Sequence, residues 1–164
     1  MTKKIPSSIY FLGASGTVTG SKYMLQSDDQ NIMIDCGLFQ GLKKLRNLNW
    51  DYLPVDPKKI DFIVLTHGHL DHVGFLPRLV KSGFKGAVYG TEPTLDVARI
   101  ILRDSAKIQE EEARKANKEG YTRHNPAEAL YTVDDANKAI EHLHPLEPNE
   151  WHSFGHGTKI RLQC

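Results

Sequence analysis

One stretch of the chain, residues 61–72, constrains the fold more than any other. It reads DFIVLT followed by HGHLDH, so a continuous apolar run leads directly into three histidines and an aspartate. An apolar run bounded by polar residues is typical of a strand that is covered on both faces. We therefore predict a buried strand over residues 61–66, with the polar cluster at its carboxyl end.

The flanking sequence supplies the other elements of a layered α/β domain. Further strands are expected over residues 9–12, 22–25, 32–35, 86–89 and 158–164. Helices are expected over residues 73–80, from a cap at Thr91 to a stop at Gly120, and over 133–143 after a cap at Thr132. Residues 37–59 carry scattered turn formers and are expected to be mostly loop.

The composition fits an ordinary globular domain. The chain has 164 residues, of which 40% are hydrophobic and 25% charged, so one domain is expected and wholesale disorder is excluded. A formal net charge of +1 provides no global field for a polyanion. No apolar run approaches a membrane span, and two cysteines form no disulfide framework. We therefore expect a cytoplasmic protein without a membrane anchor.

The polar cluster has the spacing of a metal site. In an extended segment the side chains of His67 and His69 point to the same side, so both can converge on one ion. Asp71 and His72 follow where the chain turns into a helix, and they can serve a second ion. Imidazole and carboxylate ligands suit Zn²⁺, with Mn²⁺ or iron as alternatives. Two adjacent ions can activate a water and clamp the oxygens of an ester or phosphodiester, so the cluster predicts a hydrolase.

Other polar residues admit simpler interpretations. Asp35, at the end of another expected strand, is either a turn cap or a carboxylate that orients a metal ligand. The glycine-rich loop at residues 13–20 lacks the dinucleotide-binding spacing and leads into a strand. The basic residues between 43 and 46 favour a solvated surface over a phosphate site. The remaining histidines are expected at the surface: His124, His142, His144, His152 and His156.

Four segments together resemble one branch of a known superfamily. The motif at residues 65–77 resembles the metallo-β-lactamase fold superfamily, and residues 13–21, 35–41 and 104–113 are similar to its beta-CASP branch of RNA-processing nucleases. The likeness extends over nearly all of residues 9–163. It implies the αββα sandwich of that family, a mixed sheet with flanking helices, and RNA entering a groove beside an inserted domain.

The resemblance also assigns roles to the candidate site residues. It makes His67 and His69 ligands of one zinc ion, and Asp71 and His72 ligands of a second. Asp71 is then a catalytic carboxylate as well as a ligand, and Asp35 is a catalytic aspartate that acts behind the ligands. The implied activity is a zinc-dependent ribonuclease that cleaves phosphodiesters with a metal-bound hydroxide. A thioester or lactam hydrolase, and a non-catalytic fragment acting through a partner chain, remain the alternatives.

The family pattern extends beyond this sequence. Relatives carry a further ligand histidine, a bridging aspartate and the inserted beta-CASP domain in positions that would lie past Cys164. Residues 1–164 are therefore expected to be a partial metallo-β-lactamase-type domain, the amino-terminal part of a longer nuclease. Four ligands shared by two ions give each ion two, whereas catalytic zinc usually has three. We expect weak zinc binding, little turnover, and self-association through an uncovered sheet face.

Overall fold

The computed structural model describes residues 7–27, 30–120 and 126–163. The strands in these ranges are β1 (Ser8–Phe11), β2 (Tyr23–Ser27), β3 (Gln30–Ile34), β4 (Phe62–Val64), β5 (Ala87–Gly90), β6 (Leu143–Pro145), β7 (His152–Ser153) and β8 (Lys159–Ile160). The helices are α1 (Lys43–Asn47), α2 (Leu70–Val73), α3 (Leu76–Lys81), α4 (Glu92–Glu119) and α5 (Val133–Ile140), with short 3₁₀ turns at Leu48–Trp50 and Pro57–Lys59.

Strands β1 to β6 form one mixed sheet in sequence order. The pairs β1–β2 and β2–β3 are antiparallel, whereas β3, β4, β5 and β6 run parallel to one another. Strand β4 lies inside the sheet, and its residues Phe62, Ile63 and Val64 are all buried. The predicted α/β fold with a buried strand before the histidines is therefore confirmed, although the strand is shorter than expected.

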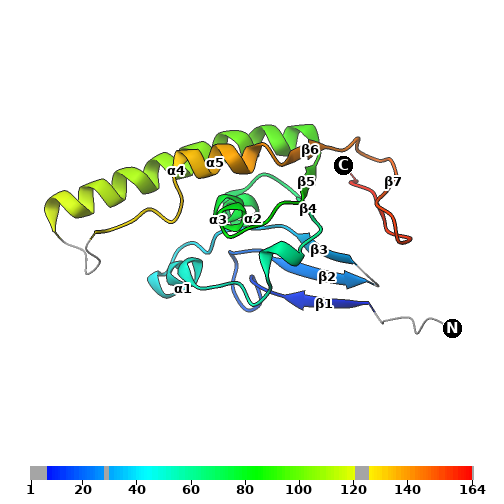
Figure 1. Ribbon diagram of the computed structural model, residues 1–164, viewed down its shortest axis with the longest axis horizontal. Coiled ribbons are helices and arrows are strands. Elements are labelled where there is room, and N and C mark those ends of the chain that lie inside the picture. The colour runs from blue at the N-terminus through cyan, green and yellow to red at the C-terminus, as the bar shows by residue number, and fades with distance from the viewer. Residues whose placement is uncertain (1–6, 28–29, 121–125, 164) are drawn as a thin grey trace.

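The two faces of the sheet are covered unequally. Helices α2 to α5 lie on one side of the sheet, and the segment with β7 lies on the other (Figure 1). The helix side contains the larger core, in which Met33, Ile63 and Val88 from the sheet meet α3, α4 and α5. The opposite side, here called the outer face, contains a small cluster in which Ile32, Phe62 and Val64 contact residues of the β7–β8 segment. Toward β1 the outer face is open, with Ile9 52% and Phe11 62% exposed.

Local signals explain where the helices begin and end. Helix α4 ends at Gly120, which adopts the left-handed conformation with φ 67° that favours glycine. Helix α5 begins with a capping box, because the Thr132 side chain accepts from the Asp135 amide and the Asp135 side chain accepts from the Thr132 amide. Thr91 precedes α4 as expected, but its hydroxyl contacts that of Thr94 and caps no backbone amide.

Several predicted boundaries were wrong. The helix expected over residues 73–80 is divided into α2 and α3, because the Phe75 amide bonds to the carbonyl of Cys36 at 2.8 Å between them. The helix expected to reach residue 143 ends at Ile140, and Leu143 begins β6 instead. The strand expected over residues 158–164 is confined to Lys159–Ile160, which pairs with β7 in a separate two-stranded sheet. Residues 37–59 contain α1 and the two 3₁₀ turns within a largely irregular segment.

Candidate metal centre

The predicted site residues gather at the carboxyl ends of two central strands of the sheet. Asp35 follows β3, and residues 66–72 lead from β4 into α2. Because β3 and β4 are parallel neighbours, their carboxyl ends lie side by side. The structure thus brings together Asp35 and the histidine cluster, which are more than 30 positions apart in the sequence.

The four predicted ligands form two pairs. The Nε2 atom of His67 lies 3.1 Å from Nδ1 of His69, and Nε2 of His72 lies 3.6 Å from Oδ2 of Asp71. The rings of His67 and His72 are 3.9 Å apart between centroids, so the two pairs adjoin. These are the same pairings that the sequence predicts for two ions, although each pair's role in metal binding stays a prediction.

A buried carboxylate, that of Asp35, contacts the cluster at His72 and at Thr66. Asp35 is 1% exposed and has a φ of 58°, a conformation that non-glycine residues rarely adopt. Its Oδ2 accepts a hydrogen bond from His72 Nδ1 at 2.7 Å, and its Oδ1 accepts from the Thr66 amide at 2.8 Å. The Thr66 hydroxyl donates to the same carboxylate. Asp35 therefore bonds to side chains of the cluster, while its role as a catalytic aspartate stays a prediction.

The environment of His67 favours the form that can bind a metal. Burial lowers the pKa of His67, and the nearby rings of His72 and His69 lower it further. A lower pKa keeps the imidazole neutral near pH 7, and only a neutral imidazole has a lone pair to offer an ion.

Backbone contacts hold residues 66–72 in place, a stretch here called the ligand segment because it contains the four predicted ligands. The carbonyl of Asp71 accepts from the Ser21 amide at 2.9 Å, and the carbonyl of His72 accepts from the Cys36 amide at 2.6 Å. Gly37 packs so tightly against this segment that a Cβ atom there would lie 1.5 Å from the carbonyl oxygen of Asp71. The residues that follow β3 therefore fix the ligand segment as well as supplying Asp35.

A buried lysine lies beside this frame. Lys22 is 2% exposed, and its ammonium group lies 4.5 Å from the ring centre of Phe39 and 4.8 Å from that of Phe75. Burial lowers the pKa of Lys22 to about 8. Burial also raises the pKa of the neighbouring Cys36 to about 12, so this thiol stays neutral. The two rings stabilise the ammonium ion in a site that otherwise disfavours charge.

The donor set suits zinc in kind but is limited in number. Imidazole nitrogen and carboxylate oxygen are zinc ligands, and two ligands of one tetrahedral zinc are roughly 3.3 Å apart. The 3.1 Å separation between His67 and His69 is close to that spacing. Within residues 7–27, 30–120 and 126–163, however, no group of three or more His, Cys, Asp or Glu side chains could hold a metal ion. Each pair would need further ligands to complete a catalytic zinc site.

Some contacts at the cluster come from residues that the sequence patterns do not indicate, whereas the other histidines are expected at the surface. Those patterns do not single out Thr66, Gly37 or Lys22, although Thr66 directly precedes the first histidine. Away from the cluster, the Nδ1 atom of His142 bonds to the carbonyl of Gly86. The Nε2 atom of His152 bonds to the carbonyl of Glu147. His144 and His156 are exposed, and His124 lies outside the described residues.

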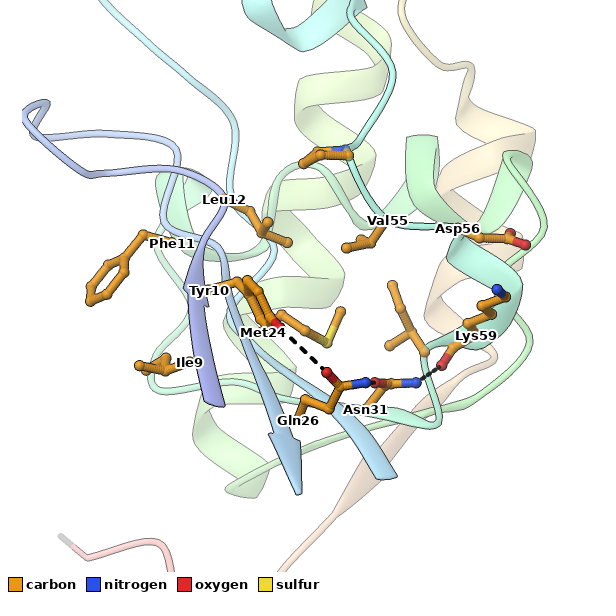
Figure 2. A pocket seen from close by; sticks show the side chains of 12 residues that line it. Ile9, Tyr10, Phe11, Leu12, Met24, Gln26, Asn31, Val55, Asp56 and Lys59 are labelled. Atoms are coloured by element: carbon orange, nitrogen blue, oxygen red, sulfur yellow. Dashed lines mark hydrogen bonds between the residues drawn. The ribbon is translucent and has the colours of Figure 1, made fainter. Parts of the chain in front are cut away.

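A cavity near the edge strand does not include the cluster. It has a volume of about 750 Å³, and its lining comes from β1, β2, Leu12, Asn31 of β3 and the segment 54–60. Figure 2 shows Leu12 and Met24 directed toward Val55, and Ile9 and Phe11 on the other side of β1. The five predicted site residues are absent from its lining.

A second hollow borders the ligand segment. This groove, about 930 Å³ in volume, lies between the segment 38–50, α4 and residues 127–130, and it reaches Leu70 of the ligand motif. Three cations line it, namely Lys43, Arg46 and Lys115, together with the indole of Trp50. Two acidic side chains, Glu112 and Glu128, also line it.

Comparison with known proteins identifies relatives over most of the chain. A family model described as the metallo-beta-lactamase superfamily matches residues 16–158. The chain is 37% identical over 145 residues to Ribonuclease TTHA0252 of Thermus thermophilus, covering 87% of this chain and 29% of that protein. It is 31% identical over 139 residues to Transcription termination factor FttA of Methanocaldococcus jannaschii, covering 85% of this chain and 20% of that protein. It is 29% identical over 146 residues to Endoribonuclease YSH1 of Candida glabrata, covering 88% of this chain and 18% of that protein. The chain thus spans less than a third of the length of these relatives.

Proposed function

Because the chain belongs to the metallo-beta-lactamase superfamily, we propose that it acts in a zinc-dependent hydrolase of the beta-CASP type that cleaves RNA phosphodiester bonds. The observation that carries this proposal is the pairing of His67 with His69 and of His72 with Asp71 in front of one buried carboxylate. The names of two relatives support RNA as the substrate, since they are described as a ribonuclease and an endoribonuclease.

Each site residue has a defined task in this proposal. His67 and His69 would hold one zinc ion, and Asp71 and His72 a second. When bound, zinc supplies Lewis acidity that activates water and polarises a phosphoryl oxygen. Asp35 accepts the Nδ1 proton of His72 and so keeps the Nε2 lone pair of that ring directed toward Asp71.

The groove beside the ligand segment is the proposed path of the RNA strand. Lys43 and Arg46 on α1 would face Lys115 on α4 across a single strand and contact its phosphates. Trp50, which is 48% exposed, offers a ring on which a base can stack. Leu70 belongs to both the groove and the ligand segment, so a strand in the groove would run toward the proposed metal ions.

Three further proposals concern the protein as a whole. We propose that residues 1–164 form part of a metallo-β-lactamase-type domain whose remaining zinc ligands come from outside the two pairs. The coverage of 29% of Ribonuclease TTHA0252 supports this view.

Every helix among the described residues is too short or too polar to span a membrane. The cytoplasm is the proposed location, and self-association through the outer face is proposed from its exposed apolar residues.

A substrate panel tests the proposed reaction. The chain, supplied with zinc, is incubated at high concentration with labelled single-stranded RNA, a thioester and a β-lactam. We expect slow cleavage of RNA alone, and its loss in His69→Ala. Turnover of the thioester or the β-lactam instead would replace the ribonuclease proposal. Zinc binding without any turnover would favour a non-catalytic role.

Charge substitutions test the proposed RNA path. We expect Lys43→Glu combined with Arg46→Glu to weaken binding of a fluorescent RNA oligonucleotide at least tenfold, with a smaller dependence on salt concentration. Lys44→Glu is the matched control, because Lys44 is exposed on the same helix but does not line the groove. Equal effects of Lys44→Glu and either groove substitution alone would show that only the overall charge matters.

A further inference from the structure

The hydroxyl of Thr66 lies between the buried carboxylate and the first histidine. Its Oγ1 atom is 2.8 Å from Oδ2 and 3.0 Å from Oδ1 of Asp35. The same atom is 3.0 Å from Nδ1 of His67. Thr66 thus connects Asp35 to a histidine that the carboxylate does not reach in any hydrogen bond among the described residues.

The chemistry of the three groups fixes the direction of each hydrogen bond. A carboxylate can only accept, so the single proton of the Thr66 hydroxyl points to Asp35. A lone pair of Oγ1 is then left facing His67, and Nδ1 of His67 must donate its proton to it. A neutral imidazole with its proton on Nδ1 has its lone pair on Nε2, the atom that faces His69 at 3.1 Å.

We propose that Thr66 is a positioning residue. Its hydroxyl links the Asp35 carboxylate to His67 and so fixes the His67 tautomer in which Nε2 can bind a metal ion. One carboxylate then orients a histidine in each pair, His72 directly at 2.7 Å and His67 through the threonine. This inference rests on the proposed metal site, but the tautomer of His67 is a property of the chain without metal.

His69 provides a contrast within the same cluster. With Nε2 of His67 as acceptor, Nδ1 of His69 is the donor of the bond between the two rings. A metal ion between them would therefore require the proton on Nδ1 of His69 to move to Nε2 of the same ring, whereas His67 and His72 already have the required tautomer. The proposal thus predicts a different response to zinc for His69 than for the other two rings.

Substitutions at Thr66 isolate the hydroxyl from the rest of the network. Thr66→Val keeps the shape and the backbone amide that bonds to Asp35 but removes the hydroxyl. Thr66→Ser keeps the hydroxyl. Thr66 is exposed, so neither change removes a packed core side chain, and both variants are expected to fold.

Nuclear magnetic resonance of chains labelled with ¹³C and ¹⁵N in the histidine rings, without metal, is the test. We expect the proton of His67 on Nδ1 in the parent and in Thr66→Ser, and a mixture of tautomers in Thr66→Val. His72 should keep its proton on Nδ1 in all three, because its 2.7 Å bond to Asp35 is direct and its contact with Thr66 Oγ1 is longer, at 3.5 Å. In a zinc titration of the same samples, we expect Thr66→Val to lose roughly tenfold or more in affinity and Thr66→Ser to restore it.

The result that would overturn the proposal is a His67 tautomer that is the same in Thr66→Val as in the parent, or that Thr66→Ser fails to restore. A parent chain that binds no zinc would contradict the proposed metal function instead. The tautomer comparison would still decide the role of Thr66 in that case, so the two failures are distinguishable.

Discussion

At the scale of single residues, the site combines groups that sequence patterns reveal with groups that they do not. The spacing of His67, His69, Asp71 and His72 shows in the sequence which side chains can meet. Thr66 and Lys22 depend on contacts with residues 31 and 53 positions away, at Asp35 and Phe75, which no local pattern encodes. The sequence leaves two roles open for Asp35, a turn cap or a carboxylate that orients a metal ligand, because a carboxylate after a strand can do either.

Lys22 should make the stability of the chain depend on pH. Its pKa is lowered from 10.5 to about 8 on folding, chiefly by burial, so between these values the unfolded chain binds more protons and stability rises with pH. Below about pH 8 the penalty is fully present. We expect Lys22→Met to be more stable than the parent there, by at most on the order of 3 kcal/mol because the two rings favour the charged form.

Urea unfolding of both proteins from pH 7 to pH 10.5 measures this effect as a difference. The advantage of Lys22→Met should shrink as the pH approaches 10.5. Burial raises the pKa values of Cys36 and Tyr131 from 9.0 and 10.0 to about 12, so both groups lower the stability of the parent and of the variant above about pH 9. Comparison of the two proteins removes this shared contribution. A constant difference between parent and variant across the range would refute the lowered pKa.

Gly37 should be required for the position of the ligand segment. We expect Gly37→Ala to cost about 1–3 kcal/mol, because the new methyl group meets the backbone of Asp71, and to weaken zinc binding. Gly41→Ala is the control: Gly41 has a φ of 81° with open space around it, so its replacement costs about 1–2 kcal/mol in backbone strain alone. Thermal unfolding and zinc titration of the two variants separate these effects. Equal zinc affinities would show that the contact of Gly37 does not position Asp71.

At the scale of elements, patterns that are local were predicted well and those that depend on pairing were not. Helix α4 was predicted at both ends, since Thr91 and Gly120 are helix signals in the sequence itself. Strand β6 was missed because three residues that include a histidine and a proline carry no periodicity, and their place is set by pairing with β5. The same reason limits the last predicted strand to the two residues that pair with β7.

The start of α5 offers a direct test of a local signal. We expect Thr132→Ala to lower the free energy of unfolding by about 1 kcal/mol, because it removes the acceptor of the Asp135 amide. Thr91→Ala should cost less, because the Thr91 side chain caps no amide of α4. Chemical denaturation of the two variants provides the comparison, and a larger loss for Thr91→Ala would contradict this assignment of the caps.

At the scale of the whole molecule, the sheet is covered over most of the helix side, except near β1 where Tyr10 is 48% exposed, and over a smaller part of the outer face. The superfamily was recognised from the sequence because its motifs are contiguous segments, and the match to residues 16–158 confirms it. The sequence predicts two ligands for each ion, and the described residues bring the four side chains together only as pairs. Ligands from distant residues would have no local pattern in the sequence by which to predict them.

The open part of the outer face should promote association between chains. Phe11 is 62% exposed on the edge strand β1, where it packs only against Tyr23 among the aromatic rings of the described residues. We expect Phe11→Lys to weaken concentration-dependent association, because a charge on an edge strand disfavours further pairing. Tyr52→Lys is the control, since Tyr52 is 98% exposed in the segment after α1. Sedimentation velocity at several concentrations measures the effect, and identical behaviour of both variants would exclude the outer face.

Zinc titration of the purified chain against a chelating indicator shows directly whether the two side-chain pairs beyond β4 bind metal ions. We expect weak binding of fewer than two zinc ions per chain. We also expect His67→Ala and His69→Ala to remove the same component of binding, and Asp71→Ala and His72→Ala to remove the other. Binding that persists when all four residues are replaced, or two tightly held ions that are indifferent to these substitutions, would contradict metal binding by these pairs.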